Sequence, residues 1–226
     1  MTKTTKLNYV FLPLVSLAFA AYLYGSIGVN GSDAIHVMPP ISYSSPVDNT
    51  VTNMAPTNAI TGNTNIGPTT FQTRVIDPVL KQINLYSAGA SKLLLGTAIQ
   101  ESFMGKLSKN IFQIEQATVK DINNRILSAH PNLRNAVQQL YNPEQSLAWN
   151  LKNNVKYEVA MARLVYLKSN QNIPDTSNVN TLGQFWKKYY NTYLGKGKAS
   201  QFSAHFASFI SSDQQASIPT ADIQSV

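Results

Sequence analysis

The side chain of Glu101 is the first candidate for acid–base chemistry in this sequence. It lies near the end of an apolar run in which Leu93, Leu94 and Ala98 recur at roughly helical spacing, and a helix here is expected to stop near Gly105. A carboxyl group at a helix end with apolar neighbours keeps its proton to higher pH, because burial disfavours the charged form. Protonation near neutral pH is what a general acid for glycosidic-bond cleavage requires.

A short apolar segment follows this predicted helix and holds the second candidate, an amide. Phe112 and Ile114 flank Gln113, and an amide among apolar neighbours needs hydrogen-bond partners, so Gln113 is either satisfied in the core or faces a cleft. Glu115 comes two residues later and in an extended segment points to the same face. It either assists a water, as the second carboxylate of an inverting hydrolase does, or caps the following helix. We favour the cap.

This region resembles the catalytic core of the lysozyme-like lytic transglycosylases, and it is most similar to phage-encoded members. That family carries Glu-Ser at the end of a helix, followed by Gly-Leu-Met-Gln or Gly-Leu-Phe-Gln. Glu101–Ser102 and Ile111–Ile114 are similar to these two motifs, and residues 112–118 are similar to a phage run reading Phe-Gln-x-Glu-Pro-Ala-Thr. The chain departs from the family where Gly-Ala-x-Gly usually precedes the second motif, because Leu107-Ser108-Lys109-Asn110 stands there and the loop is shorter.

The resemblance implies a lysozyme-like helical fold and a role for each candidate. In the family the glutamic acid, here Glu101, protonates the glycosidic oxygen between N-acetylmuramic acid and N-acetylglucosamine. It then acts as a base on the muramyl 6-hydroxyl, which gives a 1,6-anhydro product, so a second catalytic carboxylate is not required. Ser102 is expected to cap or position the acid or to touch the substrate; the alternative is a purely local bond from its side chain to the backbone. Gln113 is expected to face the cleft.

A third motif lies near the end of the predicted domain. Tyr190–Asn191 resembles the family's Tyr-Asn pair, whose tyrosine approaches the catalytic glutamate and whose asparagine orients the substrate. The preceding aromatics, Phe185 and Trp186, are more simply explained as helix core. The candidate site thus has Glu101 as the catalytic residue and, as substrate-binding candidates, Ser102, Gln113, Glu115, Tyr190 and Asn191.

Composition limits the chemistry and the partners of this 226-residue chain. It has no cysteine and only three widely separated histidines, so we expect no disulfide framework, no metal site and no cofactor. Its net charge of +7 suits an anionic partner. No cluster of Lys and Arg interleaved with aromatics occurs, so nucleic acid is not expected. Peptidoglycan glycan strands are the expected partner, and the resemblance to phage sequences adds virion proteins as a candidate.

The chain divides into four predicted segments. Residues 1–30 hold two lysines and then an apolar run of about twenty residues, long enough to span a bilayer. We predict a membrane anchor whose positive end stays cytoplasmic, so that the rest of the chain faces the periplasm or cell wall; a cleaved signal peptide is the alternative. Residues 31–70 lack Lys and Arg and are rich in Pro, Asn, Ser and Thr, which predicts a disordered linker. Residues 71–210 are the predicted domain and 211–226 a polar tail.

The apolar spacing in residues 71–210 predicts a mainly α domain. The predicted helices cover 77–85, a run from about 91, 118–127, 131–140, 143–166, 181–193 and 200–210. Together these features predict a membrane-tethered peptidoglycan lytic transglycosylase, phage-encoded and suited to local opening of the wall. Two alternatives stay open: a hydrolytic muramidase, and a non-catalytic virion structural or wall-binding protein.

Overall fold

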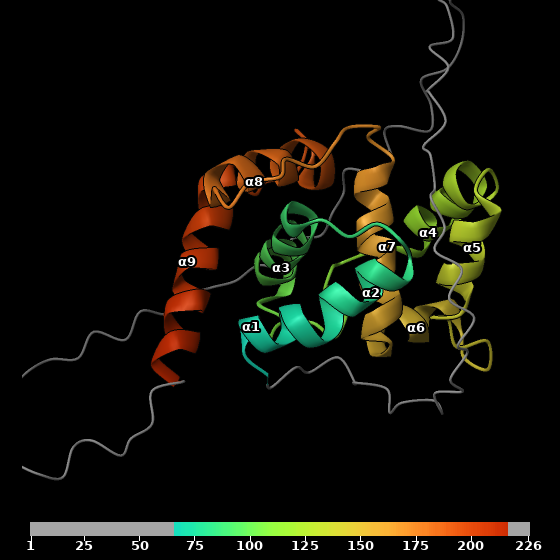
Figure 1. Cartoon of the computed structure of the whole chain (residues 1–226), viewed down its shortest axis with the longest axis horizontal. Helices are drawn as coiled ribbons and strands as arrows, with labels where there is room; N and C mark the ends of the chain where they lie inside the picture. Colours follow the sequence, from blue (N-terminus) through green and yellow to red (C-terminus); the bar gives the residue numbers. More distant parts are fainter. Residues whose placement is uncertain (1–65, 217–226) are drawn as a thin grey trace, which may run out of the picture. The chain divides into compact units, whose positions relative to one another are not determined.

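A computed structural model describes residues 66–216 of the chain (Figure 1). Within these residues every regular element is helical and no strand occurs, which confirms the predicted mainly α class. The predicted membrane anchor at residues 1–30, most of the predicted linker and the end of the predicted tail lie outside the described residues. Among the helices that the structure does describe, none combines the length and the apolar character needed to cross a membrane.

The helical body extends past the predicted boundaries at both ends. Helix α1, Pro68–Phe71, begins on a proline inside the stretch whose composition predicts linker, because proline is well suited to the first turn of a helix. At the other end α9, Ala199–Ala216, continues six residues into the predicted polar tail. The Asp213 carboxylate accepts a hydrogen bond of 3.1 Å from the Thr69 backbone N–H, so the two ends hold each other.

The candidate acid is carried by a helix that is buried along most of its length. Helix α3, Ala88–Ser102, starts at Ser87, whose hydroxyl accepts the Ala90 N–H at 3.0 Å and thereby caps the helix. Leu93, Leu94 and Leu95 are all fully buried, so α3 has no continuous solvent face before its last turn. The segments α1, η2 and α2 precede it as a nearly continuous helical rod, with η2 at Gln72–Ile76 and α2 at Asp77–Gln82.

A second buried helix, α7, forms the centre of the described part of the chain. The sequence predicts one helix over 143–166, but the structure divides it into α6, Leu147–Asn153, and α7, Val155–Leu167. Asn154 interrupts it with a non-helical backbone, and its side chain accepts the Tyr157 N–H at 3.2 Å and donates to the Leu140 carbonyl at 2.7 Å. An amide that satisfies backbone groups on both sides competes with the helix, so the prediction of one continuous helix is wrong.

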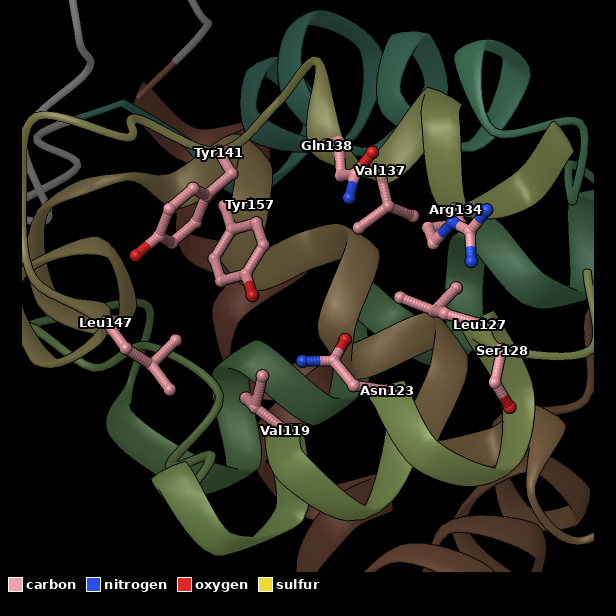
Figure 2. A pocket seen from close by; sticks show the side chains of 10 residues that line it. All are labelled: Val119, Asn123, Leu127, Ser128, Arg134, Val137, Gln138, Tyr141, Leu147 and Tyr157. Carbon is pink, nitrogen blue, oxygen red and sulfur yellow. The ribbon is translucent and has the colours of Figure 1, made fainter. Parts of the chain in front are cut away.

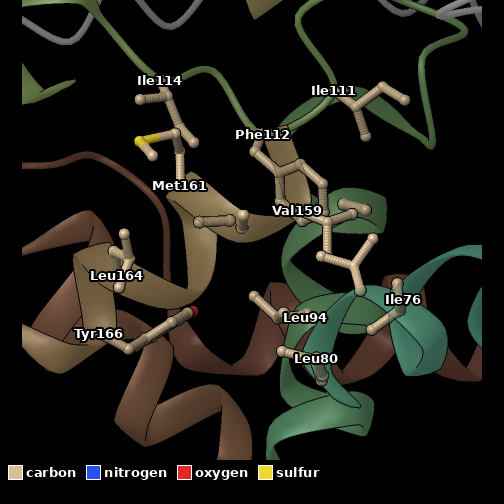
Figure 3. Close-up of a cluster of buried hydrophobic side chains, with 14 of the residues drawn as sticks. Ile76, Leu80, Leu94, Ile111, Phe112, Ile114, Val159, Met161, Leu164 and Tyr166 are labelled. Atoms are coloured by element: carbon tan, nitrogen blue, oxygen red, sulfur yellow. The ribbon is translucent and has the colours of Figure 1, made fainter. Parts of the chain in front are cut away.

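Helix α7 lies between two groups of helices (Figure 1). On one side are α4, η3 and α5, at Gln116–Ile122, Asn123–Leu127 and Pro131–Gln138, together with α6. On the other side are α3, α9, α8 at Val179–Trp186 and η4 at Lys187–Asn191. A loop between α3 and α4 crosses over α7, and Figure 3 shows its Phe112 beside Val159 and its Ile114 beside Met161.

Candidate active site

Glu101 lies one residue before the end of α3, where the backbone turns sharply. Phe103, Met104 and Gly105 follow with φ of 50°, 56° and 88°, so three residues in a row are left-handed. The helix therefore ends at Ser102 and not on Gly105 as predicted, with the Phe103 and Met104 N–H groups closing onto carbonyls of the last turn. A left-handed non-glycine residue costs of order 1–3 kcal/mol and persists where its surroundings fix it, which is common at functional sites.

The Glu101 carboxyl is half-buried and is held by one specific donor. The indole N–H of Trp186, on α8, donates to Glu101 Oε1 at 2.9 Å. Burial raises the pKa of Glu101 to about 7, because desolvation penalises the carboxylate more than the indole hydrogen bond stabilises it. Burial and the nearby charge of Glu101 also raise the pKa of Tyr166 and Tyr190, which places both phenols in the electrostatic neighbourhood of this acid.

Ser102 has no exposed surface and connects the end of α3 to the loop that follows. Its hydroxyl accepts the Gly105 N–H at 2.9 Å and donates to the Ile111 carbonyl at 2.8 Å. The hydroxyl thus donates one hydrogen bond and accepts another, both with backbone groups. These bonds agree with the purely local role, and the burial of Ser102 argues against a substrate contact. A role in positioning the acid stays a prediction.

Gln113 is exposed on a tight turn formed by residues 110–114, which we call the Gln113 turn. The Asn110 side chain brackets this turn, since its Oδ1 accepts the Ile114 N–H at 3.0 Å and its Nδ2 donates to the Ile114 carbonyl at 2.9 Å. Gln113 has a left-handed φ of 54°, and its amide nitrogen donates to the Asn110 carbonyl at 2.6 Å. The side chain is therefore not a core amide. That it faces a cleft stays a prediction.

Glu115 stands at the N-cap position of α4, but its carboxylate makes no capping hydrogen bond. Only its backbone carbonyl takes part, by accepting the Val119 N–H at 3.2 Å. The favoured prediction, that Glu115 caps this helix, agrees with its N-cap position, although the exposed carboxylate stays in solvent and the backbone alone begins the helix. The alternative role, as a second cleft carboxylate, stays a prediction.

The structure brings Tyr190 to the Gln113 turn from 78 residues away. Its hydroxyl donates to the Phe112 carbonyl at 2.7 Å, and its ring packs on Tyr166 with centroids 5.1 Å apart. Asn191, the next residue, accepts a hydrogen bond of 2.8 Å from Lys187 Nζ, which also donates to the Gly195 carbonyl at 2.7 Å. Tyr190 thus contacts the Gln113 turn, whereas the side-chain oxygen of Asn191 is bonded within its own loop.

Sequence reasoning missed two residues of this site. Trp186 is fully buried, as the helix-core interpretation predicts, but it is also the hydrogen-bond donor to Glu101. Glu158 is fully buried on α7, and its Oε2 accepts the Ile111 N–H at 2.7 Å and, more weakly, the Phe112 N–H at 3.4 Å. A signal for Glu158 exists in the sequence, because it falls three residues after Val155 and four before Ala162 on an apolar helical stripe.

A cavity of about 340 Å³ opens on the other side of α7, among α4, α5 and α6 (Figure 2). Its walls are largely apolar and include Val119, Leu127, Val137, Leu147 and Tyr157, with Arg134 among the polar groups at its edge. No carboxylate lines it, so the cavity lacks the acid that bond cleavage requires. Residues 66–216 also contain no group of His, Cys, Asp or Glu side chains arranged to hold a metal ion.

The site therefore combines a half-buried acid, an indole donor and a turn held rigidly at its backbone. This arrangement can donate a proton near neutral pH and take it back, because a pKa of about 7 leaves both forms of Glu101 accessible. Comparisons of the chain with protein-family models, with curated proteins and with solved structures find no match.

Proposed function

We propose that this protein is a peptidoglycan lytic transglycosylase with a lysozyme-like helical domain, in which Glu101 is both the acid and the base. The observation that carries the proposal is the Glu101 carboxyl at the end of α3, with its pKa raised to about 7 by burial and one oxygen bound to Trp186. A carboxyl group with an ordinary pKa would be ionised at neutral pH and could not protonate a leaving group.

The proposed reaction needs one carboxyl group in two successive roles. Protonated Glu101 gives its proton to the oxygen that joins N-acetylmuramic acid to the next N-acetylglucosamine, and the bond from C1 of muramic acid to that oxygen breaks. The C1 centre becomes oxocarbenium-like, and the carboxylate of Glu101 then removes the proton from the muramyl 6-hydroxyl. The freed oxygen bonds to C1, which gives the 1,6-anhydro ring and regenerates the acid.

The surroundings of Glu101 support a lyase over a hydrolase. A retaining or inverting hydrolase places a second carboxylate across the scissile bond. The nearby Glu158 is buried with one oxygen bound to backbone amides, and its pKa is raised to about 9, mainly by burial, so at neutral pH it is neither charged nor accessible. Glu115 is the remaining candidate for activating a water, and it is exposed at the start of α4.

Product analysis tests the proposal. The full-length chain, solubilised in a mild detergent, is incubated with isolated peptidoglycan beside Glu101→Gln, and the released fragments are weighed by mass spectrometry. We expect 1,6-anhydromuramic ends from the wild type and none from the variant. Reducing ends that disappear in Glu115→Gln would indicate the hydrolytic muramidase. A wild type that sediments with the wall but releases nothing would indicate a wall-binding or virion structural protein.

The cellular setting is proposed on the sequence alone. A basic, apolar N-terminal segment would fix the domain to a membrane and direct it toward the periplasm or wall, and a phage-encoded enzyme of this kind would open the wall locally. Mass measurement of the protein recovered from expressing cells tests the anchor, because a retained segment leaves the full-length mass. A chain that begins near Ala21 would instead indicate a cleaved signal peptide.

A further inference from the structure

The backbone of the Gln113 turn is held by side chains from three separate helical segments. Ser102, at the end of α3, donates to the Ile111 carbonyl at 2.8 Å. Tyr190, on η4, donates to the Phe112 carbonyl at 2.7 Å. Glu158, on α7, accepts the Ile111 N–H at 2.7 Å and lies 3.4 Å from the Phe112 nitrogen. Four backbone groups of two adjacent residues are thus fixed from outside the turn.

Among these side chains, Glu158 is the one whose burial destabilises the fold. Its Oε2 has backbone partners, but its Oε1 is buried without a hydrogen bond. A buried carboxyl group with one unsatisfied oxygen destabilises a fold, and an apolar residue of similar size would avoid that cost. An apolar side chain at this position would leave the two N–H groups of Ile111 and Phe112 without this acceptor.

We propose that Glu158 is a positioning residue, which fixes the Gln113 turn against the Glu101 site by accepting the backbone N–H groups of Ile111 and Phe112. It does not touch the substrate. Its consequence for catalysis rests on the proposed function, whereas its hold on the turn stands on the hydrogen bonds alone. A turn that is free to shift would move Phe112 and, through its carbonyl, Tyr190, and would let water reach the Glu101 carboxyl.

Two substitutions separate the acceptor from the bulk of the side chain. Glu158→Gln keeps an oxygen that can accept both N–H groups, and its neutral amide resembles the protonated acid that burial favours by raising the pKa to about 9. Glu158→Leu fills similar space without an acceptor. Val137→Ala, at a nearly fully buried position of α5 on the other side of α7, is the matched control for general destabilisation. If the Leu variant does not fold, Glu158→Asp replaces it, because it withdraws the carboxyl by one methylene.

Hydrogen exchange in the full-length chain tests the hold on the turn without any assay of activity. We expect amide exchange in peptides covering residues 108–116 to be slow in the wild type and in Glu158→Gln, and clearly faster in Glu158→Leu. Val137→Ala should leave this segment unchanged relative to the wild type. Equal protection in the wild type and the Leu or Asp variant would overturn the proposal.

A second measurement follows the ionisation of Glu101. With Trp149→Phe as the background, Trp186 is the chain's remaining tryptophan, so its fluorescence titration reports ionisation of Glu101 through their hydrogen bond. We expect the midpoint near pH 7 to persist in Glu158→Gln and to fall toward 4.5 in Glu158→Leu, because water would reach the carboxyl. A midpoint that moves as far in Val137→Ala would show a merely structural effect and contradict positioning.

Activity is the last readout, and it separates the two proposals. If the wild type releases anhydro fragments, Glu158→Leu should lose about 10–100-fold in kcat with a smaller change in KM, since misplacing catalytic groups by about 1 Å costs up to about 100-fold. Glu158→Gln should keep most of the wild-type kcat. A wild type without activity would reject the proposed function, while the exchange and fluorescence results would still decide whether Glu158 holds the turn.

Discussion

The two sides of α7 differ in the groups that they bury. Consecutive residues of this helix serve both, because Tyr157 lines the cavity on one side and Glu158 binds the Gln113 turn on the other. The cavity side has volume, apolar walls and no carboxylate. The Glu101 side contains a half-buried acid, a fully buried acid and left-handed backbone at Phe103.

Energetically unfavourable features and cavity volume therefore predict different places for chemistry in this protein. Apolar walls such as Val119 and Leu127 follow from ordinary packing, and a gap among them requires no further explanation. Two carboxyl groups with pKa raised by burial, at Glu101 and Glu158, destabilise the folded state, and such conflicts with local rules are expected at functional sites. Substitutions on the two sides of α7 decide whether activity depends on the acids or on the cavity.

The largest expected effect is on turnover of peptidoglycan. Glu101→Gln should lower kcat by about 10²–10⁴-fold, because it removes the general acid without changing the shape of the side chain. On the cavity side, Arg134→Gln should leave kcat unchanged. Release of soluble muropeptides measures kcat in both variants. A larger loss in Arg134→Gln than in Glu101→Gln would indicate that the active site is the cavity.

The pH dependence of activity should report the same acid. The pKa of Glu101 is raised to about 7, so the proton-donating form predominates below pH 7 and declines above it. We expect kcat/KM to fall by about tenfold per pH unit on the alkaline side of that value. Initial rates between pH 5 and 9 measure this decline, and rates that stay constant up to pH 9 would contradict Glu101 as the acid.

Stability should depend on pH through the same carboxyl group. A raised folded-state pKa means that the folded protein binds the proton more tightly than the unfolded chain, so this contribution is full below pH 4.5 and is lost as pH rises through about 7. Glu101→Gln needs no proton and should therefore be more stable than the wild type at pH 8, by at most about 3 kcal/mol. Thermal unfolding at pH 4 and pH 8 measures the difference, which should vanish at the lower pH. An equal difference in stability between the two proteins at both pH values would exclude this linkage.

The smallest expected effect concerns the indole donor. The Trp186 hydrogen bond lowers the pKa of Glu101, so Trp186→Phe should raise this pKa. The pH above which kcat/KM declines should then rise by up to about one pH unit. Trp149→Phe, on α6, is the matched control and should leave this pH unchanged. A downward shift in Trp186→Phe would mean that water entry outweighs the lost donor.

Local signals in the sequence predict much of the fold and the position of the acid. Apolar spacing places a helix through Leu93, Leu94 and Ala98, and Glu101 follows at its end, as the structure has it. The same reasoning fails at Asn154, where side-chain hydrogen bonds to Leu140 and Tyr157 break a run whose spacing predicts one helix. It succeeds at Glu115, which stands at the N-cap position of α4, although its side chain makes no capping hydrogen bond.

The sequence by itself determined most of the helical segments, which carboxyl group stands at a helix end, and that Gln113 follows on a short apolar loop, because each depends on neighbours a few positions away. Only the tertiary structure decided that Trp186 reaches Glu101 across 85 positions and that Glu158 reaches Ile111 across 47. Those contacts arise from the packing of α7 and α8 against α3 and its following loop, and periodicity carries no information about which helices will meet. The burial that raises the pKa of both acids follows from the same packing.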